Sequence, residues 1–184
     1  MKTIKNLLSI LVIFTSLTFV SCDDEPVDPT LLNTANNPSS GGGTPSTTVV
    51  GTYKLTAFNT SVSTDLNNDG TSSTNQLSET TCFNNSFLTL NANNTFSADS
   101  KGVEIDLGTN TLDCFTDPVT IGTWAVSGST LTTTYVDSGT TYTETYTISG
   151  NTLTYSLNGG EIVGTAGGNP VYLTSNIQII YTKQ

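Results

Sequence analysis

After Cys22, apolar and polar residues alternate along most of the chain, and no segment keeps an apolar repeat of 3.6 residues. A period of two is typical of β-strands that bury one face. The clearest segment is 130–157, in which turn-forming residues at 137–139 and 149–151 separate three alternating runs. This pattern predicts three antiparallel strands with an apolar, aromatic face and a threonine-rich face.

Further strands are expected wherever the same alternation returns. Eight or nine strands result, and an antiparallel sheet of that size closes into a barrel because closure removes its exposed edges. We therefore expect an all-β fold, an antiparallel up-and-down β-barrel of about eight strands, with an open β-sandwich as the alternative. The segments 59–81 and 158–170, rich in Asn, Thr and Gly, are expected to be loops. The additional strands are expected at 49–58, 86–91, 95–100, 120–126 and 170–183.

The N-terminal residues have the features of a targeting segment. Lys2 and Lys5 precede a mostly apolar run over 7–20, which is too short to span a bilayer comfortably. The run ends in "FVSC", and this junction resembles the signal of bacterial lipoproteins. The resemblance implies that residues 1–21 are removed and that Cys22 carries acyl chains, which anchor the protein to a membrane. The alternative is an ordinary secretory signal followed by a chance cysteine.

The residues after Cys22 predict where the domain is displayed. The acidic cluster 23–25 resembles the export tag of surface lipoproteins, which implies the outer face of an outer membrane; a solvated charge run on a tether is the alternative. Residues 26–48 are rich in Pro, Gly, Ser, Thr and Asn and cannot bury enough apolar surface to fold. We therefore expect residues 22–48 to form a lipidated N-terminus and linker, and residues 49–184 to form one domain.

Charge and composition exclude several function classes. Removal of the signal leaves fifteen acidic residues against three lysines, a formal net charge of −12, with no arginine and no histidine. This balance disfavours nucleic acid as a partner and disfavours contact of the domain with an anionic bilayer. Catalytic triads and histidine-ligated zinc are excluded. Glu104 and Asp106 would share one strand face as a carboxylate pair for glycoside hydrolysis, but they fit surface charge better, so we expect no enzymatic activity.

Several pieces of the sequence together resemble a known family. They are "VGTYKL" at 50–55, "DLNNDG" at 65–70, Cys82 followed by "FLTLNANNTF", and "IGTWAVSGSTL" at 121–131. In this order and spacing they resemble the lipocalin-like domain found in bacterial lipoproteins, over about residues 49–184. The resemblance implies an up-and-down barrel with an interior cavity, and it implies no particular ligand.

Cys82 and Cys114 are the remaining cysteines once Cys22 is acylated. Cysteines of exported domains are usually paired, and these two have only each other. A catalytic thiol would need a base, and the chain has no histidine to supply one. The sequence therefore predicts a disulfide that closes a loop of about 33 residues and stabilises the domain by roughly 3–4 kcal/mol.

The segment 65–71 carries oxygen-bearing side chains in the order of a calcium loop. Asp65, Asn67 and Asp69 occupy positions one, three and five of a D-x-[DN]-x-[DN]-G pattern. Gly70 follows at the position of the sharp turn, and Thr71 stands where a backbone carbonyl would coordinate. Calcium prefers six to eight such hard oxygens.

The C-terminal half of this loop departs from an EF-hand. Gln76 replaces the bidentate glutamate, no flanking helices are expected, and the nearest carboxylate is Glu79. The alternative is a polar turn, in which Asn and Asp side chains bond to their own backbone. The sequence predicts a possible Ca²⁺ site formed by Asp65, Asn67, Asp69, Thr71 and Glu79.

One acidic residue lies on an aromatic face. Glu144 stands between Tyr142 and Tyr146, which share a face with Ile148. If this face points into the barrel, the carboxylate is a polar handle for a ligand, and Glu144, Tyr142 and Tyr146 are candidate binding residues. A carboxylate more often reaches the barrel rim or faces water, and that alternative stays open. Trp124 is expected to plug the barrel base rather than to contact a ligand.

Two functions are consistent with these features. The first is a binding module that holds a small apolar or amphipathic molecule inside the barrel. The second is a non-enzymatic surface scaffold with a solid barrel, whose loops contact an unknown protein partner. An eight-stranded barrel can be solid or can hold one ligand, so the strand count does not separate them.

Overall fold

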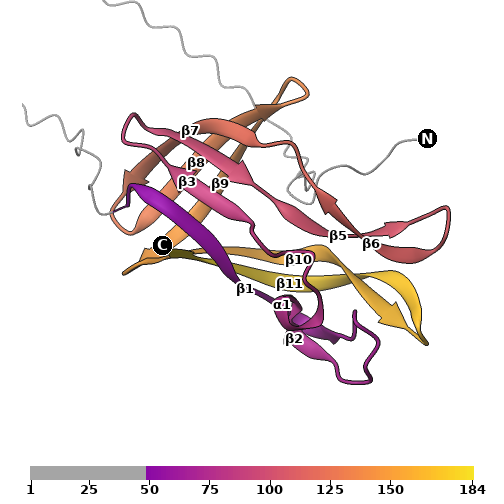
Figure 1. The fold of residues 1–184 in the computed structure, drawn as a ribbon. Helices are drawn as coiled ribbons and strands as arrows, with labels where there is room; N and C mark the ends of the chain where they lie inside the picture. The colour runs from indigo at the N-terminus through magenta and orange to yellow at the C-terminus, as the bar shows by residue number, and fades with distance from the viewer. Residues whose placement is uncertain (1–48) are drawn as a thin grey trace, which may run out of the picture.

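The computed structural model describes residues 49–184, which form a closed antiparallel barrel (Figure 1). The eight strands of the ring pair in the order in which they occur along the chain, and the last pairs with the first, so the ring has no open edge. The expected all-β barrel is confirmed. Its strands are β1 (Gly51–Thr64), β3 (Phe87–Leu90), β4 (Thr95–Asp99), β7 (Thr120–Ser127), β8 (Thr130–Asp137), β9 (Thr140–Ser149), β10 (Thr152–Ala166) and β11 (Asn169–Lys183).

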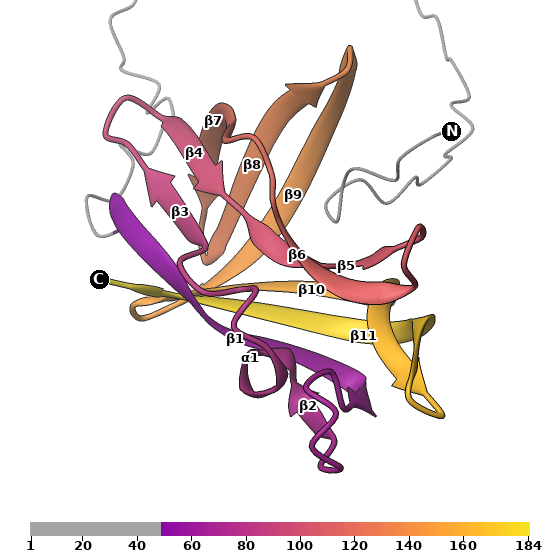
Figure 2. The ribbon, with the colours of Figure 1, turned by 45° about the vertical axis from the view of Figure 1, so that its right-hand side comes forward.

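Two pieces lie outside the ring. β2 (Ser73–Asn75) pairs with the far end of β1 and leads into the single turn of α1 (Gln76–Glu79). β5 (Lys101–Asp106) and β6 (Thr111–Thr116) form a separate hairpin, inserted between β4 and β7. Figure 2 shows this hairpin lying over the long ends of β10 and β11.

The meander β8–β9–β10 follows the predicted alternation. Ser138 and Gly139 both have positive φ, 49° and 82°, as the tight turn between β8 and β9 requires. Leu131 and Leu153 are 0% exposed, and the threonines of β9 face outward. The aromatic face is therefore the inside of the barrel.

The buried side chains form two clusters. One fills the barrel and includes Trp124, Leu131 and Leu153. The other lies between the hairpin and the extended ends of the long strands, and joins Val103 and Ile105 of β5 to side chains of β1, β10 and β11. The hairpin therefore buries apolar side chains of the long strands that lie outside the barrel interior.

The prediction of a loop was wrong for most of 158–170, which is strand, and for 59–64, which belongs to β1, whereas 65–72 is a loop as expected. β1 continues to Thr64, and β10 and β11 stay paired as far as Ala166 and Asn169. The register between them shifts between Leu157 and Gly160, so the alternation breaks there and resumes beyond. The extra length is stabilised by packing under the hairpin, which the local sequence pattern does not reveal.

No helix in the described part of the chain is long and apolar enough to cross a membrane. The predicted signal at 1–21, the acylation site Cys22 and the linker up to residue 48 lie outside the described residues.

Candidate ligand-binding site

Glu144 lies on the inner face of β9, and two tyrosines hold its carboxylate. The hydroxyl of Tyr135 on β8 donates to Oε1 at 3.2 Å, and that of Tyr146 donates to Oε2 at 2.6 Å. Strand alternation places Glu144 and Tyr146 on one face, and β8 brings Tyr135 beside them. Of the alternatives left open by the sequence, the structure selects the inward orientation.

Burial raises the pKa of the Glu144 carboxyl, while the hydrogen bonds from Tyr146 and Tyr135 oppose that rise. The pKa of Tyr146 is also raised, first by its burial and then by the neighbouring Glu144 charge. A proton on any of these groups is therefore held more tightly than in water.

More tyrosines surround this pair. The ring of Tyr142 stacks on that of Tyr135, with centroids 5.4 Å apart. On the other side, Tyr146 contacts the rings of Tyr155 and Tyr181 at centroid distances of 5.7 and 6.5 Å. Tyr142 therefore belongs to the packed interior, whereas Tyr146 connects Glu144 to the second pair of rings.

A narrow pocket opens beside this second pair of rings. Its volume is about 50 Å³, which is room for about three or four water molecules. Of the three candidate residues predicted from the sequence, Tyr146 lines the pocket, and Glu144 lies directly behind it. The lining comprises Leu55, Phe58, Phe83, Ser86, Ser100, Lys101, Phe115, Asp117, Tyr146, Tyr155, Ile179 and Tyr181.

The charged lining residues stand where the hairpin joins the barrel. Lys101 donates to Asp99 Oδ1 at 2.8 Å and to the carbonyl oxygen of Asn85 at 2.8 Å. Asp117 is held by its backbone N–H, which donates to the Ser100 carbonyl at 3.0 Å. Sequence reasoning missed both charged residues, because Lys101 begins the hairpin and Asp117 follows it, outside the runs of alternating apolar residues.

Three polar groups of the lining are available to a ligand. Within residues 49–184, the hydroxyls of Tyr155 and Tyr181 and the carboxylate of Asp117 have no hydrogen-bond partner. The alternating pattern places Tyr155 and Tyr181 on apolar strand faces, so the sequence contained a signal that could have identified these two residues. An apolar pocket with a few convergent polar groups is the usual form of a small-molecule site.

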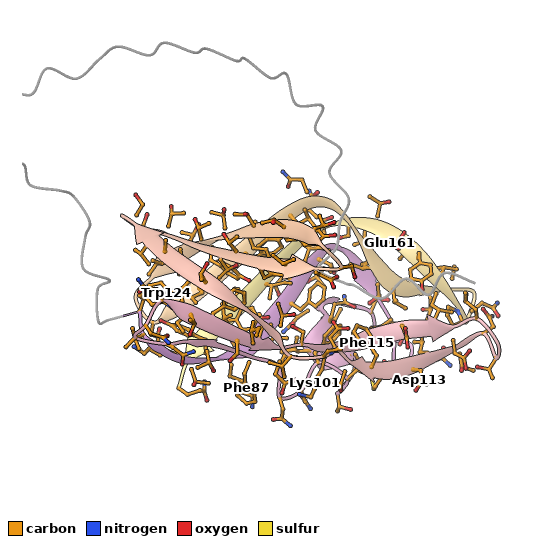
Figure 3. All side chains as sticks on the ribbon, turned by 90° about the horizontal axis from the view of Figure 1, so that it is seen from above. Phe87, Lys101, Asp113, Phe115, Trp124 and Glu161 are labelled. Carbon is orange, nitrogen blue, oxygen red and sulfur yellow. A yellow bond between two sulfur atoms is a disulfide. The ribbon has the colours of Figure 1, made fainter. Side chains whose placement is uncertain are left out.

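The predicted disulfide is confirmed, and it joins the hairpin to the turn before β3. Cys82 and Cys114 are bonded, with their Cα atoms 5.1 Å apart. Cys114 lies on β6 directly before Phe115, a lining residue of the pocket. Figure 3 shows Phe115 near the base of the hairpin and Asp113 further out along it, with Trp124 towards the other end of the barrel.

Trp124 and the acidic pair of β5 lie outside the pocket lining. Trp124 is 3% exposed, and its Nε1–H donates to the Asn91 carbonyl at 3.1 Å, in keeping with a packing role. On the hairpin, Glu104 is exposed, and Asp106 accepts hydrogen bonds from the Gly108 N–H and the Thr109 hydroxyl, which lower the pKa of Asp106.

The loop 65–71 is ordered by its own side chains. The Asp65 carboxylate accepts the N–H groups of Asp69 and Gly70 at 3.1 and 2.9 Å, and the Asn67 side chain accepts that of Asp69 at 3.0 Å. Asp69 Oδ1 in turn accepts the Thr71 N–H at 2.8 Å. These are the bonds of a polar turn.

Glu79 bonds to the backbone of this loop rather than to its side-chain oxygens. It is 5% exposed, and its Oε2 accepts the Leu66 N–H at 3.2 Å. In the part of the chain that the structure describes, no three acidic, histidine or cysteine side chains are grouped so that they could hold a metal ion. Calcium binding by Asp65, Asn67, Asp69, Thr71 and Glu79 therefore stays a prediction.

We expect 5 mM CaCl₂ to raise the melting temperature by about 4 °C relative to EDTA, if the site has a Kd about tenfold lower than that concentration. Differential scanning calorimetry of the chain measures this difference. Asp65→Asn is expected to abolish it, whereas Asp106→Asn, which alters a polar turn on the hairpin, is expected to preserve it. Equal melting temperatures in calcium and in EDTA would show that the loop is a polar turn and binds no calcium.

Comparison with known proteins supports the same fold. A search of curated proteins and a search of solved structures each found no match. The sequence pattern of the lipocalin-like domain matches residues 49–155, which run from the start of the barrel into β10. This match covers more than half of the chain, and the chain belongs to the lipocalin-like domain family.

Proposed function

We propose that this chain is a lipid-anchored lipoprotein of the cell surface whose barrel binds one small apolar or amphipathic molecule. A lipocalin-like barrel suggests ligand binding in general. The observation that carries the specific proposal is the aromatic pocket beside Tyr146, where the Tyr155 and Tyr181 hydroxyls have no partner among residues 49–184. Solvent reaches both hydroxyls in the pocket, so a ligand that enters it can replace water as their hydrogen-bond partner.

The shape of the pocket limits the size of the ligand. A volume of about 50 Å³ holds neither a long acyl chain nor a whole aromatic ring system, so the ligand would insert one small group, and a ring would enter only as the lining side chains move apart. Glu144 supports such a site through Tyr146, whose hydroxyl it orients. We therefore assign Glu144 to positioning and Tyr146 to contact with the ligand.

The proposed anchor rests on the N-terminal sequence, in which Cys22 ends an apolar signal and precedes an acidic cluster. Acylation at Cys22 would hold the chain at the membrane. We expect Cys22→Ser to move the protein from the membrane fraction to the soluble fraction. A protein that stays in the membrane fraction after this change would contradict the proposed anchor.

Native mass spectrometry tests the bound ligand. The chain without residues 1–22, purified without detergent, is expected to carry one stoichiometric extra mass that dissociates on collision. Ile179 lines the pocket, so Ile179→Trp is expected to fill the pocket and remove this mass. Ile121→Trp is the matched control, because Ile121 is 72% exposed on β7.

The surface scaffold with a solid barrel is the competing function. It predicts a bare protein in native mass spectrometry and no binding of small aromatic probes. It also predicts that Ile179→Trp destabilises the fold, because there would be no ligand space for the larger ring.

A further inference from the structure

We infer that this pocket selects a ligand whose polar end is a protonated amine, and that Asp117 is the side chain that pairs with it. The inference rests on the proposed function and adds the chemical class of the ligand. It depends on the uneven placement of charge around the pocket.

Asp117 offers an anion that the protein itself does not use. Its backbone N–H is fixed to the Ser100 carbonyl, whereas its carboxylate has no partner among the described residues. Burial raises the pKa of the Asp117 carboxyl, and the neighbouring acidic groups of Glu104 and Asp137 raise it further. A half-buried carboxylate among like charges favours the approach of a cation.

Lys101, the cation of the lining, is already compensated. Its ammonium group forms an ion pair with Asp99 at 2.8 Å and donates to the Asn85 carbonyl. A ligand carboxylate would compete with Asp99 for this group and would enter a pocket that also contains Asp117. The positions of these charges therefore disfavour an anionic ligand.

The rest of the lining suits an organic cation. Aromatic faces attract ammonium groups within about 6 Å of the ring centroid. Behind Tyr146, the carboxylate of Glu144 adds negative potential to the inner wall. The rings that contribute to the pocket are those of Phe58, Phe83, Phe115, Tyr146, Tyr155 and Tyr181.

Three probes of one ring system test this selection: tryptamine, tryptophol and indole-3-acetate, which are cationic, neutral and anionic at pH 7. Isothermal titration calorimetry with the chain lacking residues 1–22 gives their dissociation constants. We expect tryptamine to bind at least tenfold more tightly than indole-3-acetate, with tryptophol between them.

Asp117→Asn tests the assigned residue. This isosteric change removes the charge of the side chain, which makes no hydrogen bond within residues 49–184. The fold is therefore expected to persist, and circular dichroism can check this. It should weaken tryptamine binding about tenfold and leave tryptophol binding unchanged. Asp113→Asn is the matched control: Asp113 is exposed on the same hairpin outside the pocket lining, and its loss should change neither constant.

The outcomes separate this inference from the proposed function. Equal affinity for the three probes, or a preference for indole-3-acetate, overturns amine selection and leaves a binding pocket in place. An amine preference that survives Asp117→Asn overturns the assignment of Asp117. If no probe binds, the amine class is wrong; if native mass spectrometry also shows a bare protein, ligand binding itself is wrong.

Discussion

Replacing both Cys82 and Cys114 with alanine is expected to lower the free energy of unfolding by about 3 kcal/mol and the melting temperature by about 10 °C. The bond closes a long loop, with a sequence separation of 32, so its loss releases much conformational freedom in the unfolded chain. Urea denaturation followed by circular dichroism measures the change. Reduction of the wild-type protein with dithiothreitol should reproduce it.

The same variant should also weaken binding of tryptophol, because the disulfide fixes the strand that carries Phe115. We expect at least a fivefold increase in the dissociation constant at a temperature where the variant is still folded. The single change Phe115→Ala is the matched comparison, since it removes the ring and keeps the bond. Unchanged stability and affinity in the double variant would show that the hairpin stays in place without the disulfide.

Glu144→Ala is expected to cost about 2–4 kcal/mol, because it leaves the buried hydroxyls of Tyr135 and Tyr146 without their acceptor. Glu144→Gln keeps an acceptor of the same shape and should cost less. Chemical denaturation of the two variants at pH 7 measures both values. Equal costs for alanine and glutamine would show that the hydroxyls find other partners.

The cost of the glutamine change should depend on pH. Burial holds the folded pKa of Glu144 above its ordinary value of 4.5, so the folded state binds the proton more tightly than the unfolded state. The wild type therefore loses stability relative to Glu144→Gln as pH rises from about 4.5 through the folded pKa, and the difference levels off above it. Denaturation curves from pH 4 to pH 8 measure this; a wild type that gains stability relative to Glu144→Gln as pH rises would contradict the raised pKa.

The barrel was predictable because its signal is local. Alternation over 130–157, with positive-φ residues such as Ser138 and Gly139 in the turns, specifies the strands and the face that each one buries. The disulfide followed from cysteine chemistry in an exported chain, and the structure confirms it. In both cases, the type and the spacing of residues along the chain are enough to predict the structural feature.

The pocket was only partly predictable. Alternation placed Glu144 beside Tyr142 and Tyr146, but one of the two hydroxyls that donate to its carboxylate belongs to Tyr135 on another strand. Lys101 and Asp117 reach the pocket because the hairpin packs over the long strands, and that placement depends on tertiary contacts. The extension of β10 past residue 157 was missed for the same reason, since its apolar side chains are buried by the hairpin.

A barrel interior that holds a ligand is tested most sharply by nuclear magnetic resonance with ¹³C-labelled tyrosine rings and bound tryptophol. We predict intermolecular nuclear Overhauser effects from the indole to the rings of Tyr146, Tyr155 and Tyr181, which line the pocket. The ring of Tyr172, 44% exposed on β11, should show none. A second hollow of the described domain, about 500 Å³ in volume, is lined by residues 77–82 together with Leu66, Asn67, Val103 and Leu112. Contacts confined to that hollow, or no contacts at saturating tryptophol, would contradict a binding site inside the barrel.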